Sequence, residues 1–316
     1  MAQIAEGLSR TGELSVSDLQ GSIARRRKEA AIGWALKAAA ALSIVISALI
    51  VFSLLGDALR FLARVDLGSL WSSGWFPRRG LFDVKTILAG TLVVAGIAML
   101  VAAPLGLGAA MYLSEYAKPR ARRWLKPILE VLAGIPSVVL GFFAITWINP
   151  ELVQKVLTGA GFFNMAAAGI AVGILVTPLV ASIAEDAFRS VPMALREAAY
   201  GLGAKKWATT LKVVLPAAVS GVMAALILGI SRAIGETMVV AIASGATGGS
   251  AFTINPADRG QTMTAAMTAL AVGSDQVRGK EGTFESLYFV GLLLFLMTLA
   301  LNIASERFIR RVRQKI

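Results

Sequence analysis

The sequence predicts an all-α, polytopic membrane protein with six transmembrane helices, and three observations support this. Hydrophobic residues make up 56% of the 316 residues and charged residues only 16%, whereas an ordinary soluble domain is about 25% charged. Mean hydropathy is +0.71. Six uncharged runs are long enough to cross a bilayer, which takes about 20 helical residues: Ala38–Gly56, Thr86–Ser114, Val131–Pro150, Val156–Ala184, Val213–Ser231 and Ser286–Ser305.

These runs are expected to form one membrane domain, residues 31–310, between two tails. Residues 1–30 are polar and predict a cytoplasmic N-terminal tail, and residues 311–316 a cytoplasmic C-terminal tail. The first run follows four basic residues, as in a secretory signal, but no small-residue cleavage site follows it, so we expect it to remain as an anchor.

A seventh uncharged stretch, Thr237–Ala257, is rich in Gly, Ser, Thr and Asn after Ala243. We expect its start to end the fifth helix and the rest to form a loop, with the sixth helix starting near Leu287. Gly and Pro inside the runs predict kinks and close helix contacts. The pair Gly169 and Gly173 favours tight packing over a dedicated dimer interface.

The distribution of basic residues predicts the orientation. The N-terminal tail, the second and fourth connections and the C-terminal tail together hold 20 Lys and Arg, and the opposite connections hold 8. By the positive-inside rule, both termini are cytoplasmic. The net charge of +12 is therefore explained mostly by topology and by anionic membrane lipid, and nucleic-acid binding is not expected.

The composition also excludes several kinds of chemistry. The chain has no Cys and no His, which excludes disulfides, Cys/His metal sites and a Ser-His-Asp triad, and we predict neither a catalytic nor a metal site. The nearest match to a phosphate-binding P-loop, Gly279-Lys280-Glu281, lacks the Ser or Thr and the upstream Gly. We therefore predict a non-enzymatic chain with no cofactor of its own.

The connection between the fourth and fifth helices, residues 188–216, is called here the coupling loop. Pro192 suits the start of a short helix and Gly201 or Gly203 its end, before a second amphipathic helix enters the membrane. On physical grounds alone, this segment is either a solvated connector or a docking element for a cytoplasmic partner.

The same connection carries a specific motif. The spacing of Glu197-Ala198-Ala199, Gly203 and Leu215-Pro216 resembles the EAA loop of ABC-importer permeases, with Val213 where Ile is usual. The resemblance implies the type I (MetI-like) fold, with a core of about residues 85–306. It also implies that the short helix docks on an ATPase subunit, with Glu197, Ala198, Ala199 and Gly203 as its contact positions.

Further motifs lie at Pro104–Tyr116, Leu132–Gly141 and Ser231–Met238. They resemble the permeases of the phosphate-specific transporter family, and the resemblance covers roughly residues 35–310. The Gly235-Glu-Thr-Met238 ending resembles the C-type (PstC-type) subunit more than the A-type. The resemblance implies ATP-driven import of inorganic phosphate across the bacterial inner membrane by alternating access. The implied partners are a second permease (PstA-like), two cytoplasmic ATPases that bind ATP and Mg (PstB-like) and an extracytoplasmic phosphate-binding protein (PstS-like).

Arg232 and Glu236 are the only charges predicted inside the fifth helix, four residues apart and hence on one face. Ionisable residues at membrane depth usually face a partner or an aqueous path, so they form either a structural ion pair or a step for an anion, which a guanidinium binds well. The hydroxyls of Ser137, Thr177, Ser231 and Thr237 either line the same path or bind their own helix's carbonyls.

Three rival functions remain open from the sequence. A permease for another oxyanion would share this architecture, whereas a secondary transporter or channel would work without an ATPase. A purely structural membrane subunit would tolerate neutralisation of Arg232.

Overall fold

The computed structural model describes residues 23–71, 74–245, 248–272 and 282–313. The chain divides into two compact units, Met1–Ser53 and Leu54–Ile316. Helix α3 (Ile23–Arg64) runs through the boundary. It begins within the predicted N-terminal tail, while residues 1–22 of that tail lie outside the described residues.

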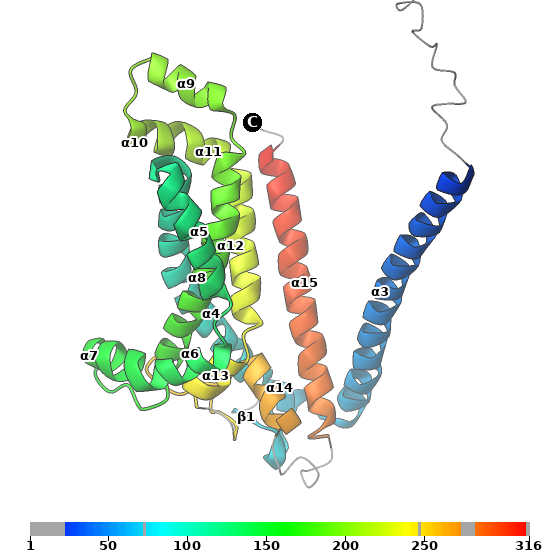
Figure 1. Cartoon of the computed structure of the whole chain (residues 1–316). Helices are drawn as coiled ribbons and strands as arrows, with labels where there is room; N and C mark the ends of the chain where they lie inside the picture. The colour runs from blue at the N-terminus through cyan, green and yellow to red at the C-terminus, as the bar shows by residue number, and fades with distance from the viewer. Residues whose placement is uncertain (1–22, 72–73, 246–247, 273–281, 314–316) are drawn as a thin grey trace, which may run out of the picture. The chain divides into compact units, whose positions relative to one another are not determined.

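The second unit is built almost entirely of helices (Figure 1). Its elements after α3 are η1 (Leu67–Trp71), β1 (Trp75–Phe76), η2 (Pro77–Arg79), β2 (Leu81–Phe82), α4 (Val84–Met111), η3 (Tyr112–Tyr116), α5 (Pro119–Ala133), α6 (Ser137–Phe143), η4 (Ala144–Val153), α7 (Gln154–Val156), α8 (Met165–Arg189), α9 (Met193–Gly201), α10 (Lys206–Thr209), η5 (Thr210–Val214), α11 (Leu215–Ala217), α12 (Val219–Ile234), α13 (Met238–Ala243), α14 (Met263–Val272) and α15 (Glu285–Arg313). The turns η3, η4 and η5 are π-helical.

Helices α4 and α8 form the centre of this unit, and glycine makes their close approach possible. A Cβ atom on Gly169 would lie 2.7 Å from Cβ of Ile97, and one on Gly173 would lie 2.7 Å from Cβ of Val101. Both partners belong to α4, which confirms that the two glycines serve packing within the chain. Gly229 of α12 approaches Val180 of α8 in the same way, so α12 completes a three-helix core.

The described residues contain five helices long and apolar enough to cross a membrane, or six if the bent pair Lys206–Ala217 and Val219–Ile234 is counted as one span. The fold class predicted from the sequence is therefore confirmed. The bend of that pair is 74°, so the second amphipathic helix of the coupling loop turns sharply before α12 begins.

Three predicted helix limits are wrong. The run Val131–Pro150 is not one helix, because Gly134 and Pro136 interrupt it between α5 and α6. The run Val156–Ala184 does not begin a helix at Val156. Instead, α8 begins at Met165, where the Asn164 side chain caps it by accepting a 2.8 Å hydrogen bond from the Ala167 N–H.

The fifth helix also ends earlier than predicted. It stops at Ile234, the chain turns through Gly235, Glu236 and Thr237, and α13 starts separately at Met238. A further helix, α14, follows the polar loop and is absent from the sequence prediction. The break after Ile234 adds no further charge to the segment, so hydropathy does not reveal it. Helix α14 is apolar but has only 10 residues, which is too short to be recognised as a span.

The segments of the second unit separate into two ends. The coupling loop with α9, α10 and α11 lies at the same end as the last turns of α15, and β1, α13 and α14 lie at the opposite end (Figure 1). At the second end, β1 and β2 form an antiparallel pair in which Trp75 faces Phe82. Their side chains pack with Phe61 and Ile87 in a separate apolar cluster.

Candidate functional site

The Arg232–Glu236 pair predicted from the sequence is formed, and it sits where α12 ends. Arg232 Nη1 donates a 3.0 Å hydrogen bond to Glu236 Oε2. Arg232 lies in the last turn of α12, whereas Glu236 lies in the turn before α13. The pair therefore bridges a break between two helices, and it is not inside one continuous helix as predicted.

Neighbouring segments fix the position of Glu236. Its side chain is 4% exposed, and its Oε1 lies 3.5 Å from the Val239 N–H in the first turn of α13. Its backbone carbonyl accepts a 2.7 Å hydrogen bond from the Thr264 hydroxyl of α14, which also lies 3.0 Å from the Thr262 hydroxyl. Neither threonine is predicted as a site residue from the sequence. Two hydroxyl side chains two residues apart, at the start of an apolar run, are the signal that could have identified them.

Arg232 has a very different environment, because its side chain is 50% exposed. A guanidinium carries five N–H donors, and within the described residues only one of them has a protein acceptor. The buried carboxylate thus holds the guanidinium by one edge and leaves the other donors accessible. This arrangement can bind an anion such as a carboxylate, sulfate or phosphate.

The four predicted path hydroxyls do not converge on Arg232 through any hydrogen bond in the described residues. Thr177 donates to the Gly173 carbonyl of its own helix, and Thr237 donates to the Gly235 carbonyl, as expected for hydroxyls that satisfy their own backbone. Ser231 donates to Asn302 Oδ1 of α15 at 3.2 Å. Ser137 is the first residue of α6. Their role in a path stays a prediction.

The coupling loop has the conformation that the motif predicts. Pro192 precedes α9, and Gly203 follows it with φ of +79°, in the left-handed region that glycine adopts without strain. Glu197, Ala198 and Gly203 are exposed, and nothing lies within 4 Å of a Cβ built on Gly203. Ala199 instead faces inward and is buried, so only the other three of the four predicted contact positions are accessible.

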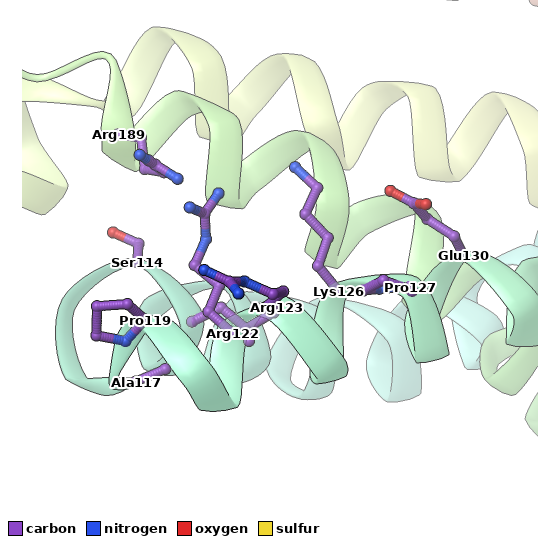
Figure 2. Close-up of a pocket in the computed structure, with 10 residues that line it drawn as sticks. Ser114, Ala117, Pro119, Arg122, Arg123, Lys126, Pro127, Glu130 and Arg189 are labelled. Carbon is purple, nitrogen blue, oxygen red and sulfur yellow. The ribbon is translucent and has the colours of Figure 1, made fainter.

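A basic cavity lies at the coupling-loop end, between the start of α5 and the end of α8. It has a volume of about 650 Å³, and Figure 2 shows Arg122, Arg123, Lys126 and Arg189 gathered around it. Glu185, which is buried, orders two of these cations by accepting from Arg122 and from Lys126 at 2.9 Å each. In the sequence, these charges indicate only the membrane topology.

The comparisons with known proteins agree with this architecture. Residues 102–316 match the family of the binding-protein-dependent transport system inner membrane component. A phosphate transport system permease protein PstC of Pasteurella multocida is 31% identical over 264 residues, which cover 78% of this chain and 80% of that protein. The probable ABC transporter permease protein YqgH of Bacillus subtilis is 35% identical over 231 residues, covering 72% and 73%.

Solved structures share the fold at lower identity. A chain of a bacterial ABC transporter involved in the import of the acidic polysaccharide alginate superposes with a TM-score of 0.62 at 16% identity, covering 91% of this chain and 99% of that one. A chain of the MetNI methionine ABC transporter, in an inward-facing conformation, gives a TM-score of 0.52 at 20% identity, covering 72% and 94%. This chain belongs to the binding-protein-dependent transport system inner membrane components and, within them, to the PstC-type ABC permeases.

Proposed function

We propose that this chain is the permease subunit of an ATP-driven importer that moves inorganic phosphate across the inner membrane by alternating access. The relatives named as phosphate transport permeases support the choice of substrate. The observation on this chain that carries the proposal is Arg232, a half-exposed guanidinium held by a buried carboxylate at a break between two helices.

Phosphate fits this site because a planar fork of N–H donors matches its oxygens and stays charged when partly desolvated. Glu236 has two roles in the proposal. It holds Arg232 in place when the path is empty, and it accepts a hydrogen bond from the protonated oxygen of hydrogen phosphate. Sulfate has no such proton at neutral pH, so the carboxylate disfavours sulfate at this step.

Energy comes from partners, and this chain performs no covalent chemistry. Two ATPases that bind ATP and Mg dock on α9 through its exposed positions, Glu197 and Ala198, and on Gly203. A second, homologous permease completes the path, and an extracytoplasmic binding protein delivers phosphate. The coupling-loop end and both termini are cytoplasmic, which the surplus of Lys and Arg in those segments supports.

Reconstitution tests the proposal. The chain is assembled in liposomes with the second permease, the two ATPases and the binding protein, and uptake of radiolabelled phosphate and sulfate is measured with and without ATP. We expect phosphate uptake that requires ATP and the ATPases. Uptake that needs no ATPase would instead identify a secondary transporter or channel, and ATP-driven uptake of sulfate alone would identify a permease for another oxyanion.

Single variants test the site within that system. Arg232→Lys keeps the charge but loses the fork, and Arg232→Gln also loses the charge, so both should reduce uptake and Gln should reduce it more. Arg310→Gln is a matched control, because Arg310 also pairs with a glutamate four residues away, Glu306, at the exposed end of α15. Equal uptake by Arg232→Gln and this control would refute the role of Arg232.

A further inference from the structure

Helix α9, the short helix of the coupling loop, carries one buried cation. Arg196 is 8% exposed, while its neighbours Leu195 and Glu197 are exposed. Arginine is rarely buried to this degree unless its charge is paired. The outward residues of α9 are therefore free to meet a partner, and Arg196 points back toward its own chain.

The guanidinium of Arg196 joins three other segments. Its Nη2 donates to Glu115 Oε1 in η3 at 2.9 Å and to the Phe188 carbonyl at the end of α8 at 2.8 Å. Its Nη1 donates to the Val191 carbonyl, in the link between α8 and α9, at 2.6 Å. Since the last carbonyls of a helix lack intrahelical donors, Arg196 binds α9 to the ends of both α4 and α8.

A second contact joins the same two regions. The Lys206 ammonium of α10 lies 5.0 Å from the centre of the Tyr116 ring, in the range of a cation–π interaction. Tyr116 and Glu115 both belong to the π-helical turn η3 that ends α4. Two cations of the coupling loop therefore contact adjacent residues of one turn.

Apolar packing does not fill the space around these contacts. A cavity of about 650 Å³ is lined by η3, the end of α8, α9 and the start of α10. Glu115, Arg196, Tyr200 and Lys206 are among the residues that line it. Within the described residues, Arg196 and Lys206 thus link the coupling loop to the turn η3 through polar contacts.

We infer that Arg196, through its ion pair with Glu115, is the positioning residue that transmits movement of the coupling helix α9 to α4 and α8. This inference rests on the proposed function, in which an ATPase moves α9. Because α4 and α8 pack in close contact at Gly169 and Gly173, a displacement applied at the ends of these two helices moves them together. Removing the guanidinium leaves α9 exposed for docking but releases it from the bundle.

The change Arg196→Gln tests this inference, because it removes the guanidinium that binds Glu115 and the carbonyls of Phe188 and Val191. Arg120→Gln is the control, because Arg120 is an exposed cation of α5 at the same end of the unit, without a protein partner in the described residues. In the reconstituted importer, we expect Arg196→Gln to retain its ATPases and to hydrolyse ATP. Phosphate imported per ATP should fall about tenfold, a typical size for coupling between sites.

A distance measurement separates positioning from a general loss of activity. The chain contains no cysteine, so Cys introduced at Leu202 and Trp124, which are 89% and 75% exposed, takes two spin labels. We expect a narrow distance distribution in the parent complex and a broad one in Arg196→Gln. A narrow distribution in the variant, or normal import per ATP with a broad one, would overturn the inference.

If Arg196→Gln does not assemble, Arg196→Lys replaces it. Lysine keeps the charge but lacks the fork that reaches Glu115 and both carbonyls, so import per ATP should still fall. Full coupling in Arg196→Lys would overturn the inference. Failure of the proposed function gives a different result: the unaltered complex would show no ATP-driven phosphate uptake, while the spin labels would still report whether Arg196 positions α9.

Discussion

The contact between α4 and α8 makes a quantitative prediction about Gly173. A Cβ atom at this position would lie 2.7 Å from Cβ of Val101 and 2.8 Å from the Ala98 carbonyl oxygen. Both atoms are too close for van der Waals contact, and the carbonyl belongs to a helix backbone that cannot rotate away. Gly173→Ala therefore forces the two central helices apart by several tenths of an ångström or more.

Overpacking of this kind lowers the free energy of unfolding by about 1–3 kcal/mol. The higher helix propensity of Ala relative to Gly offsets less than about 1 kcal/mol of this loss. We expect a net loss of about 1–2 kcal/mol, which lowers the melting temperature by about 2–8 °C at the sensitivity usual for larger domains. Gly96→Ala in α4 is the matched control, because a Cβ on Gly96 meets nothing within 4 Å.

The assay is thermal unfolding of the purified chain in one detergent, at one scan rate, because membrane proteins commonly unfold irreversibly. Gly173→Ala should melt several degrees below the parent, and Gly96→Ala should melt within about a degree of it or slightly above it. Equal melting temperatures for Gly173→Ala and Gly96→Ala would refute the close approach of α4 and α8.

Three further predictions concern the coupling-loop end. Ala198→Trp adds a large side chain to the exposed face of α9, so ATPase subunits should co-purify poorly while the chain still inserts; normal co-purification would contradict the docking surface. Glu185→Gln weakens the shared acceptor of Arg122 and Lys126, which are partly exposed, and should cost about 1–2 kcal/mol in thermal unfolding; an unchanged melting temperature would count against the network. Hydrogen bonds to Glu185 and to a neighbouring aspartate raise the pKa of Lys126. The contribution of Lys126 to the free energy of unfolding is therefore complete at pH values below its ordinary pKa, and it is lost only as the pH rises through the raised pKa. The difference in melting temperature between the parent and Lys126→Met should accordingly be constant from pH 6 to pH 9, and a difference that disappears within this range would contradict the assignment.

The hydropathy pattern predicts the fold class well but places helix limits poorly. Long uncharged runs show which segments avoid water, and they predict the six spans that the described residues contain when the bent pair is counted as one. Hydropathy does not show where the backbone breaks, because Gly134 and Pro136 are as uncharged as the helices they separate. Their residue types do predict a kink there, but not that the helix ends. The cap at Asn164 is likewise invisible to hydropathy, since the run continues across it.

The candidate site could also be predicted only in part from the sequence. The four-residue spacing of Arg232 and Glu236 predicts their ion pair, because the turn after α12 keeps the two side chains on one side. The spacing does not predict that one partner is buried and the other half-exposed, which depends on α13 and α14. Arg196 could not be singled out at all, because a cation in a polar loop is normally solvated, and its burial depends on the distant Glu115.

The most direct test of the account is phosphate uptake by the double variant Arg232→Gln and Glu236→Gln. This variant removes the ion pair without leaving either charge buried alone. If the pair is purely structural, phosphate transport should therefore largely recover in this variant. If Arg232 is instead an electrostatic step for phosphate, the double variant should form a stable complex that hydrolyses ATP but imports little phosphate. Full ATP-driven phosphate uptake by this variant would contradict the account.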